Sequence, residues 1–88
     1  MPRYFFHVVD DMITRDGEGQ ECADVAEAWA YALRSARSLI CEQVRRGRIS
    51  LRHRIDVSDE AGNPAFSLSF GDAVAIEGQS DFKSGGIT

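Results

Sequence analysis

One long amphipathic pattern, from about Val25 to Arg46, constrains this chain more than any other feature of its sequence. Apolar residues recur there at positions i, i+3, i+4 and i+7, the spacing of one face of an α-helix. The members of this stripe are Val25, Ala28, Trp29, Ala32, Leu33, Ala36, Leu39, Ile40 and Val44. Asp24 is a good N-cap, with Glu27 three residues later, and Gly47 supplies the left-handed position that ends many helices. The sequence therefore predicts one helix whose apolar stripe needs a second layer to cover it.

Strand patterns lie on both sides of this helix. Arg3–Val9 is rich in aromatic and β-branched residues and carries apolar side chains on both period-2 faces. This pattern indicates a central strand, or one whose second face meets a partner. After a turn, residues 12–15 fit a short second strand. Ile49–Ser58 alternates strictly between apolar and polar residues, which is typical of a strand with one buried face. A hairpin loop at 59–63 leads to a last strand over Ala65–Phe70.

These elements predict an α+β domain of order β(β)αββ, in which one amphipathic helix packs on a three- to four-stranded antiparallel sheet. Residues 1–77 are expected to form a single domain, with a short turn at 72–76 that packs back on it. Residues 78–88 have the composition of a flexible C-terminal tail. A chain of 88 residues buries only a small core, and small domains often add buried surface by self-association.

Cysteine usage and hydropathy indicate the compartment. Cys22 precedes the helix and Cys41 lies deep within it, too far apart to form a disulfide, and two free thiols fit a reducing environment. The apolar run Tyr4–Val9 is too short for a signal peptide, and no stretch reaches the roughly 20 apolar residues of a membrane span. We therefore expect a soluble cytoplasmic protein with no membrane contact.

No catalytic, cofactor or metal signature stands out. His7 and His53 lack the spacing of a zinc site, and His53 is expected to be a hydrogen-bonded core histidine. The acidic residues between 10 and 24 do not match a calcium loop, so a solvated acidic loop is expected there. Cys22 is the one candidate nucleophile, because a thiolate is favoured near a helix N-terminus. We expect no cofactor and no enzymatic activity.

Charge is distributed unevenly along the chain. Seven arginines and one glutamate give residues 34–54 a net charge of +6, although the whole chain carries −4. The candidate interaction patch consists of Arg45, Arg46, Arg48, Arg52 and Arg54. Such a patch can bind phosphate, nucleic acid or an acidic partner. Alternatively, its arginines compensate the helix end and pair with acidic loops of the same or a second subunit.

Several motifs in combination resemble a known family. The opening PRYFFHV at residues 2–8, the acidic-glycine loop, DVAEA at 24–28, IDVSDEAG at 55–62 and LSFGDAV at 68–74 are similar to a family of short, uncharacterised proteobacterial proteins, a domain of unknown function. The resemblance implies no activity. A weaker likeness to the HicB-type antitoxin fold rests on element order and on the acidic loop before the helix, and it implies a small partner-binding module.

The sequence leaves three functions open. The first is a non-enzymatic interaction or regulatory module that forms a homo-oligomer or binds a protein partner. The second is a nucleic-acid or phosphate-ligand binder that uses the arginine patch, although a pI near 5.0 is unlike that of a dedicated nucleic-acid binder. The third is a small thiol-dependent enzyme that uses Cys22.

Overall fold

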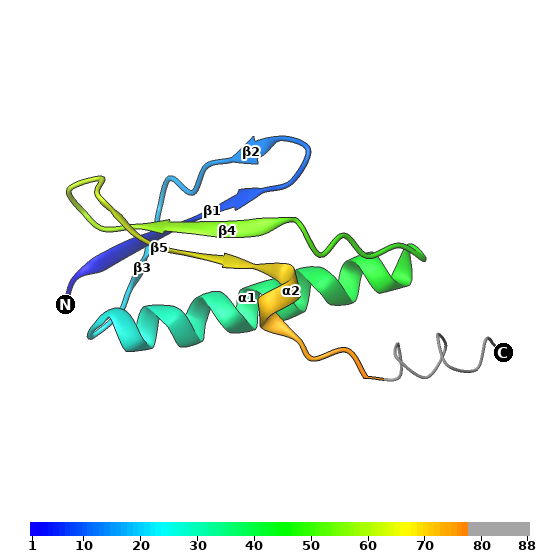
Figure 1. Cartoon of the computed structure of the whole chain (residues 1–88). Coiled ribbons are helices and arrows are strands. Elements are labelled where there is room, and N and C mark those ends of the chain that lie inside the picture. The colour runs from blue at the N-terminus through cyan, green and yellow to red at the C-terminus, as the bar shows by residue number, and fades with distance from the viewer. Residues whose placement is uncertain (78–88) are drawn as a thin grey trace, which may run out of the picture.

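The computed structural model of the chain, which describes residues 1–77, is an α+β domain with one long helix on one face of an antiparallel sheet (Figure 1). In chain order the elements are β1 (Arg3–Val9), β2 (Ile13–Thr14), β3 (Gln20–Glu21), α1 (Val25–Arg45), β4 (Arg54–Ser58), β5 (Pro64–Ser69) and α2 (Phe70–Ala73). The predicted fold class is therefore confirmed. The tail predicted at 78–88 lies outside the described residues.

The long helix begins and ends where the sequence predicts. The Asp24 carboxylate accepts a hydrogen bond from the Glu27 N–H at 2.9 Å, and the Glu27 carboxylate accepts one from the Ala23 N–H at 2.6 Å. The first bond satisfies an N–H group that the helix N-terminus leaves without a partner, and the second ties the residue before the N-cap to the first turn. At the other end Arg46 is the C-cap, and Gly47 follows with φ +83°.

The sheet order is β2-β1-β4-β5, and β3 also pairs with β1, so the first strand of the chain is central. One edge of β1 pairs along its length with β4. The other edge pairs with β2 at one end and with β3 at the other. Of the two readings of this strand, the central position is confirmed.

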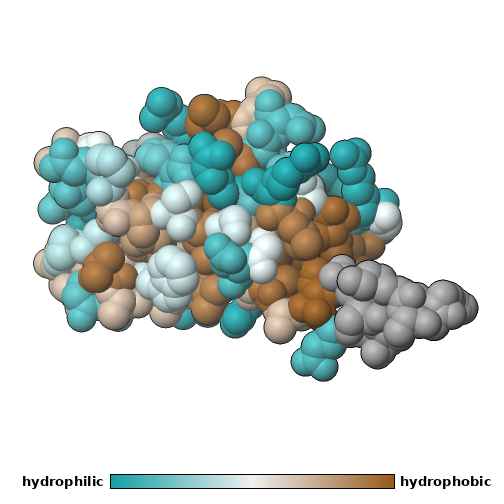
Figure 2. Space-filling view, in the orientation of Figure 1, coloured by the Kyte–Doolittle hydropathy of each residue, from teal (hydrophilic) through white to brown (hydrophobic). Residues whose placement is uncertain are grey.

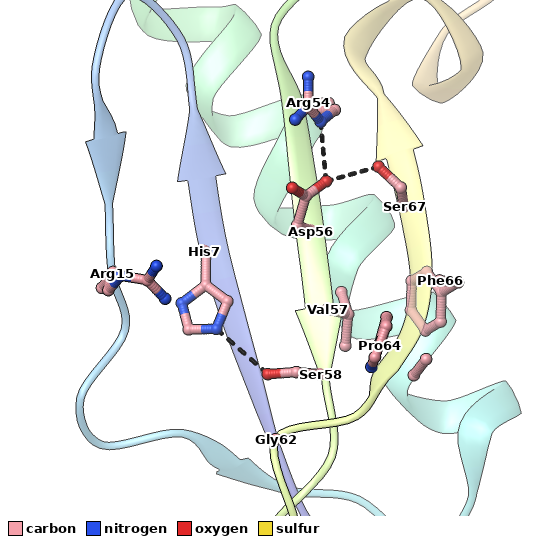
Figure 3. Close-up of a pocket in the computed structure, with 11 residues that line it drawn as sticks. His7, Arg15, Arg54, Asp56, Val57, Ser58, Gly62, Pro64, Phe66 and Ser67 are labelled. Carbon is pink, nitrogen blue, oxygen red and sulfur yellow. Dashed lines mark hydrogen bonds and ion pairs between the residues drawn. The ribbon is translucent and has the colours of Figure 1, made fainter.

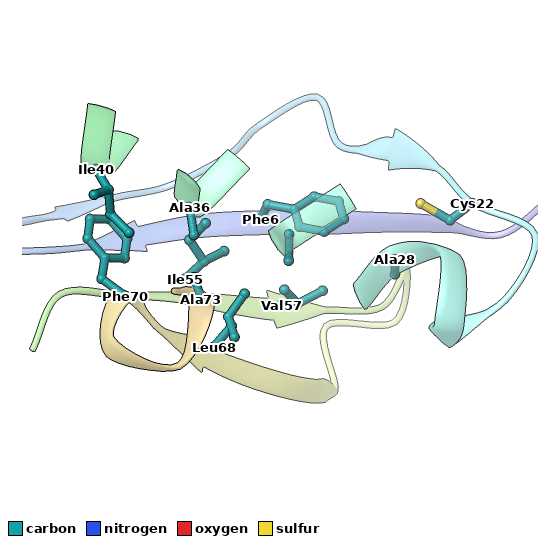
Figure 4. Packing of buried hydrophobic residues seen from close by; sticks show 11 residues of the cluster. Phe6, Cys22, Ala28, Ala36, Ile40, Ile55, Val57, Leu68, Phe70 and Ala73 are labelled. Atoms are coloured by element: carbon teal, nitrogen blue, oxygen red, sulfur yellow. The ribbon is translucent and has the colours of Figure 1, made fainter. Parts of the chain in front are cut away.

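The core lies between α1 and the inner face of the sheet (Figure 4). Its buried members are Phe6, Cys22, Ala28, Ala32, Ala36, Ile40, Ile55, Val57, Leu68, Phe70 and Ala73. Three of the four buried α1 residues are alanines with no exposed surface. Because a methyl group takes little room, these alanines let the helix approach the sheet closely.

The apolar stripe of α1 is wider and longer than the surface it packs against. Val25, Trp29 and Val44 were predicted within the stripe, yet they are 52%, 41% and 55% exposed. A helix of 21 residues is about 31 Å long, whereas strands of five to seven residues span about 17–23 Å. The ends of α1, with Val25 and Val44, are therefore left without cover. Trp29 packs at its side on the Phe66 ring, with 5.1 Å between ring centroids.

The strand predicted over Ile49–Ser58 begins only at Arg54, so its first half was predicted wrongly. The pairing of β4 with β1 ends at Val9 and Arg54, and no strand lies beside residues 49–53. Their backbone bonds elsewhere: the His53 carbonyl accepts from the Phe70 N–H at 2.8 Å and the Leu51 carbonyl accepts from the Gly71 N–H at 3.1 Å. Alternation of residue types produces a strand only where a partner edge is available.

The last predicted elements are confirmed with shifted boundaries. The final strand ends at Ser69, whose hydroxyl accepts a hydrogen bond from the Asp72 N–H at 3.2 Å and caps α2. Phe70 and Ala73 thereby turn into the core. Exposed hydrophobic side chains include Ile49, Leu51 and Ile76, and in Figure 2 hydrophobic residues reach the surface around the place that α2 occupies in Figure 1.

Candidate functional site

The outer face of the sheet, opposite α1, carries an ordered set of polar side chains (Figure 3). His7 of β1 pairs in register with Asp56 of β4, which pairs with Ser67 of β5. Strand alternation places these three on the face away from the core residues Phe6, Ile55 and Leu68. A hollow of about 610 Å³ lies over this face. Its lining residues are His7, Arg15, Arg54, Asp56, Val57, Ser58, Gly62, Pro64, Ala65, Phe66 and Ser67.

The hydrogen bonds of His7 define its tautomer. The backbone N–H of Asp16 donates to His7 Nδ1 at 3.0 Å. Since a backbone N–H can only donate, Nδ1 carries no proton, and a neutral His7 carries its proton on Nε2. His7 Nε2 lies 3.1 Å from Ser58 Oγ, so the imidazole donates and the serine hydroxyl accepts.

This direction is the reverse of the one that nucleophilic catalysis needs. A general base accepts the proton of the serine hydroxyl, and a carboxylate orients the base by accepting from its other nitrogen. Here Ser58 accepts from His7, and the partner of Nδ1 is an N–H donor. The grouping of Ser58, His7 and Asp56 thus resembles a catalytic triad in composition but not in hydrogen bonding.

The charged centre of the outer face is an ion pair within β4. Arg54 Nε donates to Asp56 Oδ1 at 2.8 Å, and the Ser67 hydroxyl donates to the same oxygen at 2.6 Å. Partial burial acts to raise the pKa of Asp56, but the hydrogen bonds from Arg54 and Ser67 outweigh it and lower that pKa below its usual value. Asp56 therefore remains ionised and holds the Arg54 side chain in place.

Asp16 joins the outer face to the edge of β1. Its carboxylate accepts hydrogen bonds from the N–H groups of Phe6, Glu18 and Gly19, each at 3.1 Å. Partial burial acts to raise the pKa of Asp16, but these three N–H groups and the nearby His7 lower it overall. The sequence predicted a solvated acidic loop here. The Asp16-Gly17-Glu18-Gly19 pattern, typical of a side chain that bonds its own loop, was the available signal for this structural role.

The predicted arginine patch is distributed over several places. Arg45 pairs with Glu42 at 3.5 Å, and Arg54 belongs to the outer-face hollow. Arg46 and Arg48 line a separate hollow of about 280 Å³ together with Asp11, Gln43, Ser50 and His53. Arg52 is exposed in the turn before β4. The structure thus brings only Arg46 and Arg48 to one hollow, beside the negative end of the α1 dipole.

His53 is hydrogen-bonded, as the sequence predicted, but it is only half-buried. Gln43 Oε1 accepts from the Ser50 N–H at 3.1 Å, so its amide nitrogen donates to His53 Nδ1 at 3.0 Å. The edge of the imidazole meets the Phe70 ring at a centroid distance of 5.7 Å. Within residues 1–77, no three His, Cys, Asp or Glu side chains come close enough together to hold a metal ion.

Both cysteines are free thiols, and they differ in accessibility. Cys22 is 1% exposed and its thiol points to the Gln20 carbonyl at 3.8 Å. Burial, with the nearby Glu27 carboxylate, raises the pKa of the Cys22 thiol. The sequence led us to expect a thiolate favoured by the α1 N-terminus, whereas the structure gives Cys22 a buried thiol whose pKa is raised. Cys41 is exposed.

Comparison with known proteins identifies the family of this chain but no individual relative. A family model described as a domain of unknown function, DUF6894, matches residues 3–71. No curated protein and no solved structure matches the chain. The matched segment includes every strand of the sheet and all of α1. Of the helices in residues 1–77, none has the length and apolar character needed to cross a membrane.

Proposed function

The chain belongs to this family of domains of unknown function, and on that premise we propose that it is a small non-enzymatic interaction module. Its partner is a protein, a second copy of this chain included. The partner binds to the outer face of the sheet. The observation that carries this proposal is the uncovered face. Among residues 1–77, the only long helix lies on the inner face, and the outer face holds the hollow of about 610 Å³ (Figures 1 and 3).

The edges of the sheet favour contact through its face. The edge strand β2 has only two residues. The other edge strand, β5, begins with Pro64, and its pairing with β4 is irregular at Val57 and Ser58. Short strands, proline and bulges are the features by which proteins prevent edge-to-edge pairing. A partner is therefore expected to meet the face of the sheet.

The hydrogen-bond geometry supports a binding role over a catalytic one. The side chains of His7, Asp56 and Ser67 are already held by neighbours. Groups that are ordered before binding lose little conformational entropy when a partner arrives. In the same arrangement Ser58 Oγ accepts a hydrogen bond from His7, whereas a nucleophilic serine donates one to its base.

Photo-crosslinking combined with light scattering tests this proposal. A photoreactive amino acid at Ser67 on the outer face is compared with one at the exposed Ser38 of α1. We expect Ser67 to crosslink to a second polypeptide that Ser38 does not capture, and a second copy would appear as a dimer mass in light scattering. A monomer at tens of micromolar, together with equal or absent crosslinking at both positions, would refute the proposal.

Binding of an anionic ligand by arginines is the second candidate. Its support is the hollow that Arg46 and Arg48 share with His53. Asp11 in the same hollow and the nearby carbonyl end of α1 both oppose a bound anion. Titration of labelled oligonucleotides at low salt tests it, because phosphate contacts are strongest there.

The cellular setting also belongs to the proposal. Two free thiols fit the cytoplasm. A bacterial source and a HicB-like partner-binding role remain suggestions of the sequence motifs alone.

A further inference from the structure

The hydrogen bonds around His7 orient the Ser58 hydroxyl as a donor. The Asp16 N–H donates to His7 Nδ1, and His7 Nε2 donates to Ser58 Oγ at 3.1 Å. Because Ser58 Oγ already accepts from the imidazole, its own proton is free to point elsewhere. No described residue accepts that proton, and Ser58 lines the outer-face hollow.

A guanidinium lines the same hollow as this hydroxyl. Arg15 is exposed and lines the same hollow, and in Figure 3 its side chain points toward the His7 ring. Within residues 1–77, Arg15 forms no ion pair and no side-chain hydrogen bond, whereas Arg54 is paired with Asp56 at 2.8 Å. Arg15 and Ser58 are thus donors without a partner at one end of the hollow.

The opposite wall of the hollow is apolar. Pro64 and Ala65 of β5 line it, and Figure 3 shows Pro64 across from His7. A ligand that fits must therefore present a negative group at one end and an apolar group at the other.

We propose that the outer-face hollow binds a carboxylate through Arg15 and Ser58, with an attached apolar group against Pro64 and Ala65. This inference rests on the proposed function, because it names the partner's chemistry: an acidic side chain or a chain terminus beside an apolar residue. A guanidinium fork matches the two oxygens of a carboxylate. The ionised Asp56 on the same face disfavours a doubly charged phosphate.

Titration with three matched small molecules, followed by two-dimensional NMR of the full chain, tests the site. Phenylacetate carries the carboxylate and the apolar group, phenylacetamide lacks the charge, and phenyl phosphate replaces the carboxylate. We expect phenylacetate to shift the resonances of Arg15, Ser58 and Ala65 in a saturable way. Weaker binding of phenylacetamide and of phenyl phosphate is expected, for lack of charge and because of repulsion by Asp56 respectively.

Variants identify the donors. Arg15→Gln and Ser58→Ala should each weaken phenylacetate binding by roughly tenfold or more, since hydrogen bonds to charged groups are worth about 1.5–3 kcal/mol. Arg52→Gln is the matched control, because it removes an exposed arginine that lines none of the described hollows. Arg15 and Arg52 are exposed and Ser58 is partly exposed. Unchanged resonances elsewhere in the spectrum of each variant verify that its fold is intact.

Each other outcome contradicts the inference. No shift with phenylacetate, an equal response to phenylacetamide, tighter binding of phenyl phosphate, or an equal loss in Arg52→Gln would overturn it. The proposed function is judged separately by the Ser67 crosslink. If Ser67 captures a partner and phenylacetate neither binds nor competes, only the carboxylate site is refuted. If phenylacetate binds and Ser67 captures nothing, the carboxylate site stands and the partner is not a protein.

Discussion

The two faces of this sheet are built from the same strands but carry different side chains, apolar on the inner face and mainly polar on the outer one. The inner face is apolar, and Ile55 and Leu68 on it are at most 1% exposed. The outer face carries the His7–Ser58 and Arg54–Asp56–Ser67 hydrogen bonds and meets no helix among the described residues. Packing accounts fully for the inner face. The order of the outer face has no such explanation, and this difference is the reason for placing the proposed interaction there.

The comparison predicts its largest effect at Phe70, which is 1% exposed in the core. Phe70→Ala should lower the free energy of unfolding by about 3–5 kcal/mol, because it removes buried apolar surface and leaves a cavity. The matched outer-face variant Ser67→Ala should cost about 1 kcal/mol or less, since its hydrogen bond is exposed. Urea unfolding measures both. Equal losses would contradict the division between the two faces.

Gly19, in the loop before β3, lies directly against β1. A Cβ there would lie 2.8 Å from the Tyr4 carbonyl and 2.9 Å from the Phe5 ring, at φ +74°. Gly19→Ala should cost about 1–2 kcal/mol for the left-handed backbone and about 1–3 kcal/mol more for overpacking. Gly62→Ala is the control, because its φ is +87° and nothing lies within 4 Å of its Cβ. Thermal unfolding should show the smaller loss for Gly62→Ala.

Removing the Asp16 carboxylate tests how the outer face is held. Asp16→Ala should cost about 1–3 kcal/mol, because the N–H groups of Phe6, Glu18 and Gly19 lose their acceptor. Asp16→Asn keeps an acceptor oxygen and should lose less. Urea unfolding gives the difference, and equal stability of Asp16→Ala and the wild type would contradict this role.

The pH dependence follows from the same carboxylate. Its pKa is lowered from 3.8 by folding, so the unfolded chain takes up the proton first as the pH falls. The stabilisation is complete above the unfolded pKa and is lost as the pH falls through the folded one. Between about pH 6 and pH 3, wild-type stability should therefore fall more steeply than that of Asp16→Asn. Parallel curves would assign the acid sensitivity to other groups.

Among the apolar positions compared, the smallest predicted loss of stability is at Trp29. The sequence placed it in the buried stripe, where loss of a tryptophan costs about 3–5 kcal/mol. Because Trp29 is 41% exposed and packs mainly on Phe66, Trp29→Ala should cost less, about 1–2 kcal/mol. Urea unfolding measures it, and a loss as large as that of Phe70→Ala would show that the stripe is buried more fully.

Local patterns predicted the elements whose causes are local. The Asp24 cap, the stripe of α1 and the alternation of Arg54–Ser58 are set by residues near in sequence. Period 2 also placed Asp56 and Ser58 on the polar face of their strand. By contrast, the turn at residues 49–53 depends on where β1 ends, and a sequence pattern does not contain that information.

The candidate site was predicted only in part for the same reason. Of the five arginines in the expected patch, Arg54 alone lines the outer-face hollow. Arg15 and Ser58 come together through the contact of the loop after β2 with β1, and His7 is oriented by a backbone group nine residues away. These relations between separate segments arise from tertiary structure. Net charge in a sequence window does not reveal them.

The edge of β1 opposite β4 has one further consequence, which concerns chain length. Two short strands and, between them, the Asp16 carboxylate supply its hydrogen-bond partners. One inserted or deleted residue at 15–19 would move Asp16 away from the Phe6 N–H and shift one of the two strand registers. The hairpin tip at 60–62 has exposed residues and ample room. We therefore expect family members to vary in length at that tip and to keep a constant length at 15–19.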